Sequence, residues 1–191
     1  MFDVALGAMT IVSAPLFSLL CKHNICLRDV LTLIEFVLIT YCTRLVDLAL
    51  DMGNGNATLL SDMGVMWLIW TLLMILTRDL YFYLTHRILH TKWLWVFHKQ
   101  HHSHEINAVG AFSFSPVETV IQYGYVPLIC ATMPYHRLTM KVFVIIDHAH
   151  TVYVHCHDKS FSHIAHHKLP SCNFGLYFPC WDYMFGTLKK H

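Results

Sequence analysis

Charged residues are scarce in this sequence of 191 residues. Lys, Arg, Asp and Glu together make up 13% of it, against roughly 25% in soluble domains. The formal net charge of +1 provides no long-range field to attract phosphate, which excludes a nucleic-acid binder held by bulk charge. Hydrophobic residues make up 55%, more than a single soluble domain of this length can bury. Scarce charge and abundant apolar surface therefore predict an integral membrane protein.

Several common motifs are also missing. The seven cysteines include no CxxC pair, which argues against a zinc ribbon or a dithiol redox centre. No cleavable signal peptide is indicated, because Asp3 replaces a basic start and no small-x-small site precedes Cys21. HExxH is absent as well, since Arg87 occupies its second position between His86 and His90, which excludes the zinc protease that this motif marks.

Long apolar runs predict the fold class: all-α, an integral membrane helical bundle of about four membrane helices or hairpins with a helical, histidine-rich cap on its cytosolic face. We expect a single domain over 1–191, with N-terminal membrane helices in 1–77 and the catalytic, histidine-rich region in 78–190. Two apolar stretches separated by Pro134–Arg137 are expected to form a helical hairpin that enters the bilayer and returns. The candidate membrane segments are 4–20, 30–50, 63–83, and the hairpin arms 106–133 and 138–155.

The distribution of charge predicts an orientation. Segment 51–62 contains two acids and no Lys or Arg, whereas 84–105 and 156–191 carry several basic residues. The positive-inside rule then places 84–105 and 156–191 in the cytosol and 51–62 outside or in a lumen. Arg137 and Lys141 at the far turn of the hairpin oppose this rule, a conflict that a re-entrant hairpin relieves.

Histidine is the abundant polar residue: 16 are present, more than the 13 Lys and Arg combined. Most lie between positions 86 and 167, and eight of them form clusters with spacings of three and four residues, which places the members of a cluster on one helix face. Eight imidazoles are too many for one zinc ion with four ligands and suit two metals with open positions. Histidines at this spacing can also share a solvated face, but three such clusters on one side of a membrane favour a metal site. The clusters are His86 and His90; His98, His101 and His102; and His163, His166 and His167.

Imidazole ligands suit Zn, Cu, Fe and Ni alike, so the ligand type does not select the metal. Iron is favoured here because two irons can split dioxygen and attack an unactivated C–H bond of a lipid at the bilayer edge. The ligands must be neutral imidazoles, so low pH is expected to release the metal.

These motifs resemble the fatty acid hydroxylase/sterol desaturase superfamily of membrane di-iron, histidine-box enzymes over about 78–190. Within this superfamily, the motifs most resemble those of cholesterol 25-hydroxylase and sterol C5-desaturase-like members. The lead from Asp79 into His86, and the sequence HKQHHS from His98, are similar to its first two boxes. Ser115-Pro-Val-Glu118 resembles its His-Pro-x-Glu, with Ser115 in place of the usual histidine. The ending from Asn173 to Thr187 is similar to the family's terminal motif.

The resemblance implies a further metal histidine at the end of the last membrane helix. His155 fits that place, and His148, His150 and His157 compete with it. Four histidines have no assigned role: His23, His104, His136 and His191. The complete set of expected catalytic metal ligands is His86, His90, His98, His101, His102, His155, His163, His166 and His167.

Other residues receive supporting roles. Asp79 and Asp182 are candidates to hold imidazole tautomers through the second ring nitrogen, or are simply a helix-end acid and a turn acid. Arg87 docks an electron donor or lies on a solvated face, and Asn173 and Trp181 shape the fold beneath the site. The segment between His155 and His163 is shorter than in the named relatives, which leaves a substrate lid in question.

The resemblance therefore implies an O2-dependent di-iron oxidoreductase that hydroxylates or desaturates a membrane lipid, sterol, fatty acyl or sphingolipid substrate. The resemblance also implies that electrons come from cytochrome b5 or a similar carrier, fed ultimately by NAD(P)H. This carrier would be a separate protein, since the sequence contains no haem-binding His-Pro-Gly-Gly of a fused cytochrome b5 module. In a eukaryote the location would be the endoplasmic reticulum, with the boxes facing the cytosol. The alternatives are a catalytically inactive member of the family and a histidine-rich membrane metal-binding or transport protein, whose histidines would lie within the spans.

Overall fold

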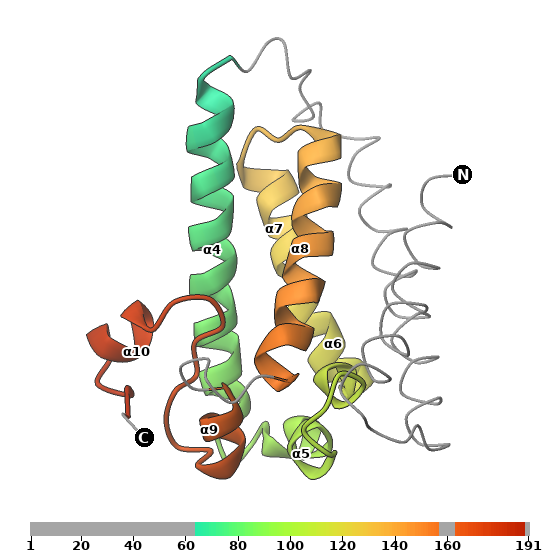
Figure 1. Ribbon diagram of the computed structural model, residues 1–191, viewed down its shortest axis with the longest axis vertical. Coiled ribbons are helices and arrows are strands. Elements are labelled where there is room, and N and C mark those ends of the chain that lie inside the picture. The colour runs from blue at the N-terminus through green and yellow to red at the C-terminus, as the bar shows by residue number, and fades with distance from the viewer. Residues whose placement is uncertain (1–63, 157–162, 190–191) are drawn as a thin grey trace.

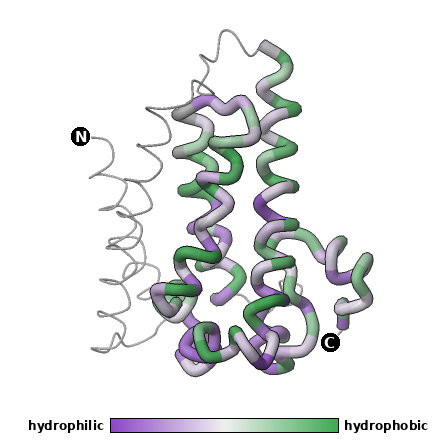
Figure 2. The backbone as a smooth tube through the Cα atoms, turned by 180° about the vertical axis from the view of Figure 1, so that it is seen from behind, coloured by the Kyte–Doolittle hydropathy of each residue, from purple (hydrophilic) through white to green (hydrophobic). Residues whose placement is uncertain are grey.

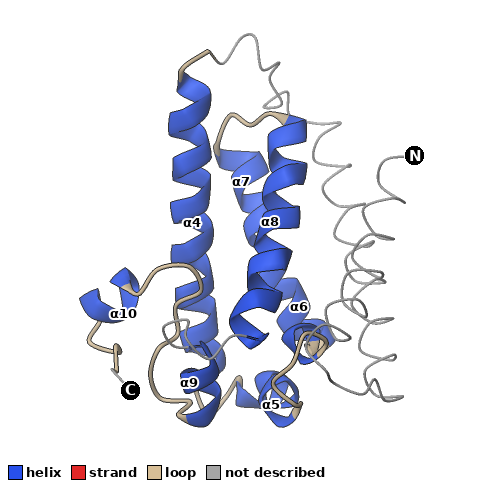
Figure 3. Ribbon diagram, in the orientation of Figure 1, coloured by secondary structure: helices blue, strands red, loops and turns tan. Residues whose placement is uncertain are grey.

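The computed structural model describes residues 64–156 and 163–189. The expected membrane segments 4–20 and 30–50, the acidic loop 51–62 and His157 lie outside the described residues. Within the described residues the structure is helical and contains no strand (Figure 3), as the sequence predicts.

The longest described helix is α4 (Met66–Leu89), which extends six residues beyond the predicted span and so carries His86 in its last turn. One stripe of α4 is buried at intervals of three or four residues, from Met74 through Arg78 and Phe82 to His86 and Leu89. Large apolar side chains cover the opposite face and are exposed, which water would not favour but lipid would. They include Leu68, Ile69, Leu72, Leu73, Leu76, Leu84 and Ile88.

Among the described residues, α4 is the one helix that is long and apolar enough to cross a membrane. Figure 2 shows hydrophobic residues dominating its upper part, whereas hydrophilic residues gather at the lower end of the molecule. The structure thus supports one candidate span of the four expected, and the others stay predictions.

The predicted hairpin is formed by α6 (Pro116–Tyr123), α7 (Tyr125–Thr132) and α8 (Arg137–Cys156), which lie beside α4 in Figure 1. Its first arm differs from the prediction in two ways. It begins at Pro116 instead of 106, because the Ser115 hydroxyl caps α6 by accepting from the Glu118 amide at 3.2 Å. It is also interrupted at Gly124, since Pro127 has no N–H to continue the helical ladder back to Tyr123. Gly124 also lets α4 pack close, because a Cβ at this position would collide with the Tyr81 hydroxyl.

A buried ion pair connects α4 to α8 within this bundle. Arg78 Nε donates to Asp147 Oδ1 at 3.0 Å, and both side chains are almost fully buried. Asp147 also accepts from the hydroxyls of Tyr125, at 3.2 Å, and Tyr177. The Arg78 guanidinium lies 4.4 Å from the centroid of the Tyr125 ring. Charge, hydrogen bonds and a cation–π contact together compensate for the desolvation of this pair.

Three short helices complete the fold at the lower end in Figure 1. These are α5 (Trp95–Ser103), α9 (His163–Lys168) and α10 (Cys180–Met184), with a 3-10 turn, η1 (Gly110–Phe112), between α5 and α6. Helix α5 contacts both α4 and α6, and α9 contacts α8. The predicted helical histidine clusters therefore lie on α5, on α9 and at the end of α4.

Candidate metal centre

The structure brings all nine predicted ligands together in two groups. In each group, one potential ligand atom of every member lies within 4.8 Å of those of the others. The first group draws on α4, α5 and α9, and the second on α5, α8 and α9. The first group is His86, His90, His98, His102 and His166, and the second is His101, His155, His163 and His167.

In the first group, the Nε2 atoms point toward one another. His102 Nε2 lies 3.2 Å from His90 Nε2, 3.1 Å from His98 Nε2 and 3.2 Å from His166 Nε2, and the His90 and His166 atoms are 3.0 Å apart. Two nitrogens that each lie about 2.1 Å from one ion, at a right angle, are separated by about 3.0 Å. The spacing of these atoms therefore suits shared coordination of a single ion.

The opposite ring nitrogens decide which atom carries the lone pair. Nδ1 of His86 faces the Phe174 carbonyl at 3.0 Å, and Nδ1 of His166 faces the Cys172 carbonyl at 2.7 Å. A carbonyl only accepts hydrogen bonds, so each Nδ1 carries the proton and each neutral ring presents its Nε2 lone pair. Lone pairs converging at this distance repel one another unless a cation lies between them.

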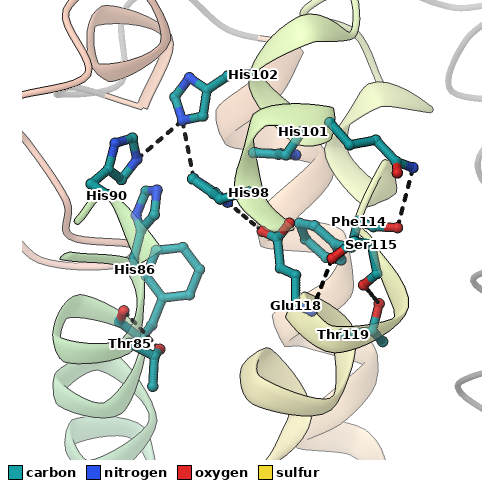
Figure 4. A network of polar contacts seen from close by, with 12 residues as sticks. Thr85, His86, His90, His98, His101, His102, Phe114, Ser115, Glu118 and Thr119 are labelled. Atoms are coloured by element: carbon teal, nitrogen blue, oxygen red, sulfur yellow. Dashed lines mark hydrogen bonds and ion pairs between the residues drawn. The ribbon is translucent and has the colours of Figure 1, made fainter. Parts of the chain in front are cut away.

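The carboxylate that orients a ring in this group is Glu118. Its Oε1 accepts from His98 Nδ1 at 2.6 Å, and both side chains are fully buried. Figure 4 shows this contact between α5 and α6, beside the contacts of His102 with His90 and His98. The sequence motif that begins at Ser115 contains Glu118, but the role of this side chain was missed, because α5 and α6 are joined by a loop whose path the sequence does not reveal.

Of the two roles considered for Asp79 and Asp182, the structure does not support the imidazole contact. Asp79 accepts instead from the Tyr177 amide at 2.8 Å and from Trp181 Nε1 at 2.9 Å. Asp182 accepts from the Phe174 amide at 2.8 Å. Both acids hold the C-terminal loop in place, and carbonyl groups of this loop contact the imidazole rings. The two acids therefore support the metal centre indirectly, through the loop.

That loop has a backbone conformation suited to its two carbonyl contacts. Asn173 lies between Cys172 and Phe174 and has a φ of 58°, in the left-handed region that asparagine tolerates. Its side chain forms two hydrogen bonds with the backbone of Lys189: it donates to the carbonyl oxygen at 3.1 Å and accepts from the amide at 2.8 Å. Asp182 also accepts from the Gly175 amide at 2.7 Å. The predicted structural role of Asn173 and Trp181 beneath the site is consistent with these contacts.

The second group is more deeply buried. His155 Nδ1 donates to the Thr151 carbonyl at 2.7 Å, and its Nε2 lies 3.4 Å from His101 Nε2. In the described part of the chain, His101 Nδ1 and both ring nitrogens of His163 and His167 are buried without a hydrogen-bond partner. Buried polar atoms without a partner cost free energy, and an ion bound by this group would provide partners. The imidazole donor set and its burial therefore fit a metal ion in each group.

The structure separates the competing histidines of α8. His155 joins the second group, whereas His148 and His150 are in neither group. His148 contacts the Tyr123 hydroxyl at 2.9 Å, and His150 Nε2 lies 3.0 Å from the Leu176 carbonyl. The histidines without an assigned role include His104 and His136, which are also outside both groups.

The electrostatics keep these rings neutral. Burial, assisted by the neighbouring His90, His166 and His167, lowers the pKa of His98 to about 2. Burial and His90 lower the pKa of His166 to about 3, and burial and His166 lower the pKa of His167 to about 4. At neutral pH these imidazoles are uncharged, which is the state that binds a metal ion.

Comparison with known proteins gives one finding. The family model described as fatty acid hydroxylase matches residues 71–187, more than half of the chain. The matched region includes both histidine groups, Glu118 and the C-terminal loop. No curated protein and no solved structure matches the chain.

Proposed function

The chain belongs to the fatty acid hydroxylase family, and we propose that it is an O2-dependent di-iron oxidoreductase that hydroxylates or desaturates a membrane lipid. The family supports an oxidative enzyme that acts on lipids. The di-iron centre, and a sterol, fatty acyl or sphingolipid as substrate, are the finer parts of the proposal.

The observation that carries the proposal is the convergence of nine imidazoles in two groups at the end of an apolar helix. His86, His90, His98, His102 and His166 would hold one iron, and His101, His155, His163 and His167 the other. Bound iron would supply the activation of dioxygen needed to oxidise an unactivated C–H bond. Nitrogen ligands without thiolates are compatible with iron, although they do not exclude zinc.

The residues of the chain would prepare this chemistry in two ways. Glu118 and the carbonyls of Cys172 and Phe174 hold protons at Nδ1 and so aim Nε2 into the first group. The near-complete burial of the second group excludes bulk water, which would otherwise compete for open positions.

The membrane would supply the substrate. The exposed apolar face of α4 continues down to Ile88, which lies at the same level along the helix as His86 but on the opposite face, so lipid in contact with α4 reaches the depth of the centre. We propose that the centre faces the cytosol, in the endoplasmic reticulum if the source is eukaryotic, and receives electrons from a cytochrome b5-type carrier. The positive-inside pattern of the sequence supports this orientation.

Metal and lipid analysis together test the proposal. Detergent-purified protein is expected to contain about one iron for each of the two histidine groups, and cells that express it are expected to accumulate a hydroxylated or unsaturated lipid. His101→Ala should abolish the product while leaving membrane insertion intact. His136→Ala is the matched control, because His136 lies outside both groups.

The outcomes separate the alternatives. Protein that binds zinc alone would refute the di-iron enzyme and favour a metal-binding or transport protein. Full iron content without any change in cellular lipids would indicate an inactive family member.

A further inference from the structure

A file of aromatic rings runs from the surface at α10 to the first histidine group. Phe185 stacks on Tyr83, with ring centroids 5.3 Å apart and an interplanar angle of 15°. The Tyr83 ring lies 6.3 Å from Phe174. Phe174 in turn lies 5.3 Å from both His90 and His166. Each ring therefore contacts the next, from the end of α10 to two of the imidazoles.

The burial of these rings changes in one direction along the file. Phe185 is 47% exposed, whereas Tyr83 is 0% and Phe174 is 5% exposed. Rings that served only to pack the core would not be expected to extend to an exposed side chain. In Figure 1, α10 lies beside the lower part of α4, away from α5 and α9.

A cation lies at the exposed end of the file. The Arg87 guanidinium is 5.9 Å from the Phe185 ring centroid and 6.0 Å from that of Tyr83. Its Nη1 donates to the Tyr83 hydroxyl at 3.0 Å. Arg87 is itself exposed, so its charge is available to a partner while its contacts hold the two rings in place.

The two segments that the sequence assigns to the same side of the membrane as Phe185 carry the same sign of charge as Arg87. In the described segments 84–105 and 163–189, the exposed charged side chains are five cations and one acid. This imbalance attracts an acidic protein and orients it before contact. The cations are Arg87, Lys92, Lys99, Lys168 and Lys189, and the acid is Glu105.

We propose that Phe185, Tyr83 and Phe174 form the route by which electrons from an acidic one-electron carrier protein, docked over Arg87 and Phe185, reach the iron that the first histidine group would hold. This inference rests on the proposed function, which requires a reductant. Hydroxylation consumes one O2, two electrons and two protons, and puts one oxygen atom in the alcohol and the other in water. Two encounters with the reduced carrier supply the two electrons, and solvent supplies the protons.

Polarisable aromatic rings connect donor and acceptor better than saturated side chains do. Hydrogen bonds also hold two of the three residues in place: the Phe174 carbonyl accepts from His86, and the Tyr83 hydroxyl lies 2.9 Å from that of Thr187. A rigid path keeps the coupling between carrier and metal centre constant from one turnover to the next.

The test compares two reductants on the same iron-loaded, detergent-purified protein. The first is the reduced soluble domain of an acidic b-type cytochrome, whose reoxidation is followed by its absorbance under O2. The second is dithionite with a small mediator, which does not need a docking surface. Phe185→Leu should slow cytochrome reoxidation several-fold and leave mediator-driven metal reduction unchanged, whereas Phe185→Tyr, which keeps a ring, should behave like wild type.

Arg87→Gln should raise the cytochrome concentration needed for half-maximal reoxidation several-fold and weaken its dependence on salt. Lys99→Gln removes the same charge from α5 and should have a smaller effect. Equal losses with both reductants would indicate a structural defect and overturn the route. Unchanged cytochrome kinetics in both Phe185→Leu and Arg87→Gln would also overturn the route, and would indicate that this surface contacts lipid instead of a carrier protein. Rapid reoxidation by wild type without any lipid product would contradict the proposed function but not the route.

Discussion

Glu118 offers the sharpest test of how the metal centre is held. Its carboxylate accepts from His98 Nδ1 at 2.6 Å, and both side chains are buried. Glu118→Gln keeps the size and an acceptor oxygen but cannot become the carboxylate that a cation bound at His98 would favour, whereas Glu118→Ala removes the acceptor as well. We expect both changes to weaken metal binding by the first group, the alanine change more strongly.

The expected magnitudes follow from the contact itself. A hydrogen bond to a charged group contributes about 1.5–3 kcal/mol, against about 1 kcal/mol for a neutral one. Losing a charged acceptor at Glu118 should therefore cost about 0.5–2 kcal/mol, or roughly 2- to 30-fold in metal affinity. In Glu118→Ala the Nδ1 proton of His98 has no acceptor, and a loss near 100-fold is expected, at the upper end of effects from outer ligand partners.

The assay is iron content after equilibration of detergent-purified protein with graded concentrations of a chelator. Glu105→Gln is the matched control, because Glu105 is exposed and lies outside both groups. Circular dichroism establishes that each variant is folded, and the isosteric Glu118→Gln keeps the test valid if Glu118→Ala does not fold. Wild-type iron affinity in a folded Glu118→Gln and Glu118→Ala pair would refute the reasoning.

Three further predictions concern the second group, the bundle and the C-terminal loop. His101→Ala should remove iron from the second group only, so the iron content per chain should fall by about half in metal analysis; complete loss would show that the groups do not bind independently. Arg78→Met leaves Asp147 buried without its cation and should destabilise the bundle by about 3–5 kcal/mol, whereas the double change with Asp147→Leu should recover part of this, because the Tyr125 and Tyr177 hydroxyls then lose Asp147 as an acceptor; thermal unfolding in detergent measures both, and a double variant as unstable as the single one would contradict it. Asn173→Ala puts alanine, which tolerates the left-handed region less well than asparagine, at a φ of 58° and removes two hydrogen bonds, and should cost about 1–3 kcal/mol in the same assay; an unchanged unfolding midpoint would show that the loop does not need this conformation.

Much of the candidate centre is predictable from local spacing. Histidines three or four residues apart share a face of any helix, so the clusters on α5 and α9 follow once those segments are helical. The length of the apolar run likewise predicts α4. These local rules predict the helices without any knowledge of what packs against each one.

Other parts depend on contacts between distant residues. Asp79 and Asp182 precede or follow histidine-rich motifs in the sequence, yet they bind the loop around Phe174 and Trp181 instead of the rings. Glu118 lies 20 residues from His98 in the chain and contacts it directly. No periodicity connects such pairs, because the loop between α5 and α6 determines their distance.

The sequence by itself determined the class of the protein and its candidate metal chemistry: apolar runs require helices in lipid, because only internal hydrogen bonding satisfies the backbone there, and clustered imidazoles require a cation or a solvated face. The tertiary structure alone decided how those imidazoles divide into two groups, that His155 joins them while His148 and His150 do not, and which carbonyls and carboxylate orient the rings. The physical reason is that a coordination group is defined by distances of a few ångströms between side chains on four helices. Spacing along the chain controls such distances within one helix, and only the packing of α4, α5, α8 and α9 controls them between helices.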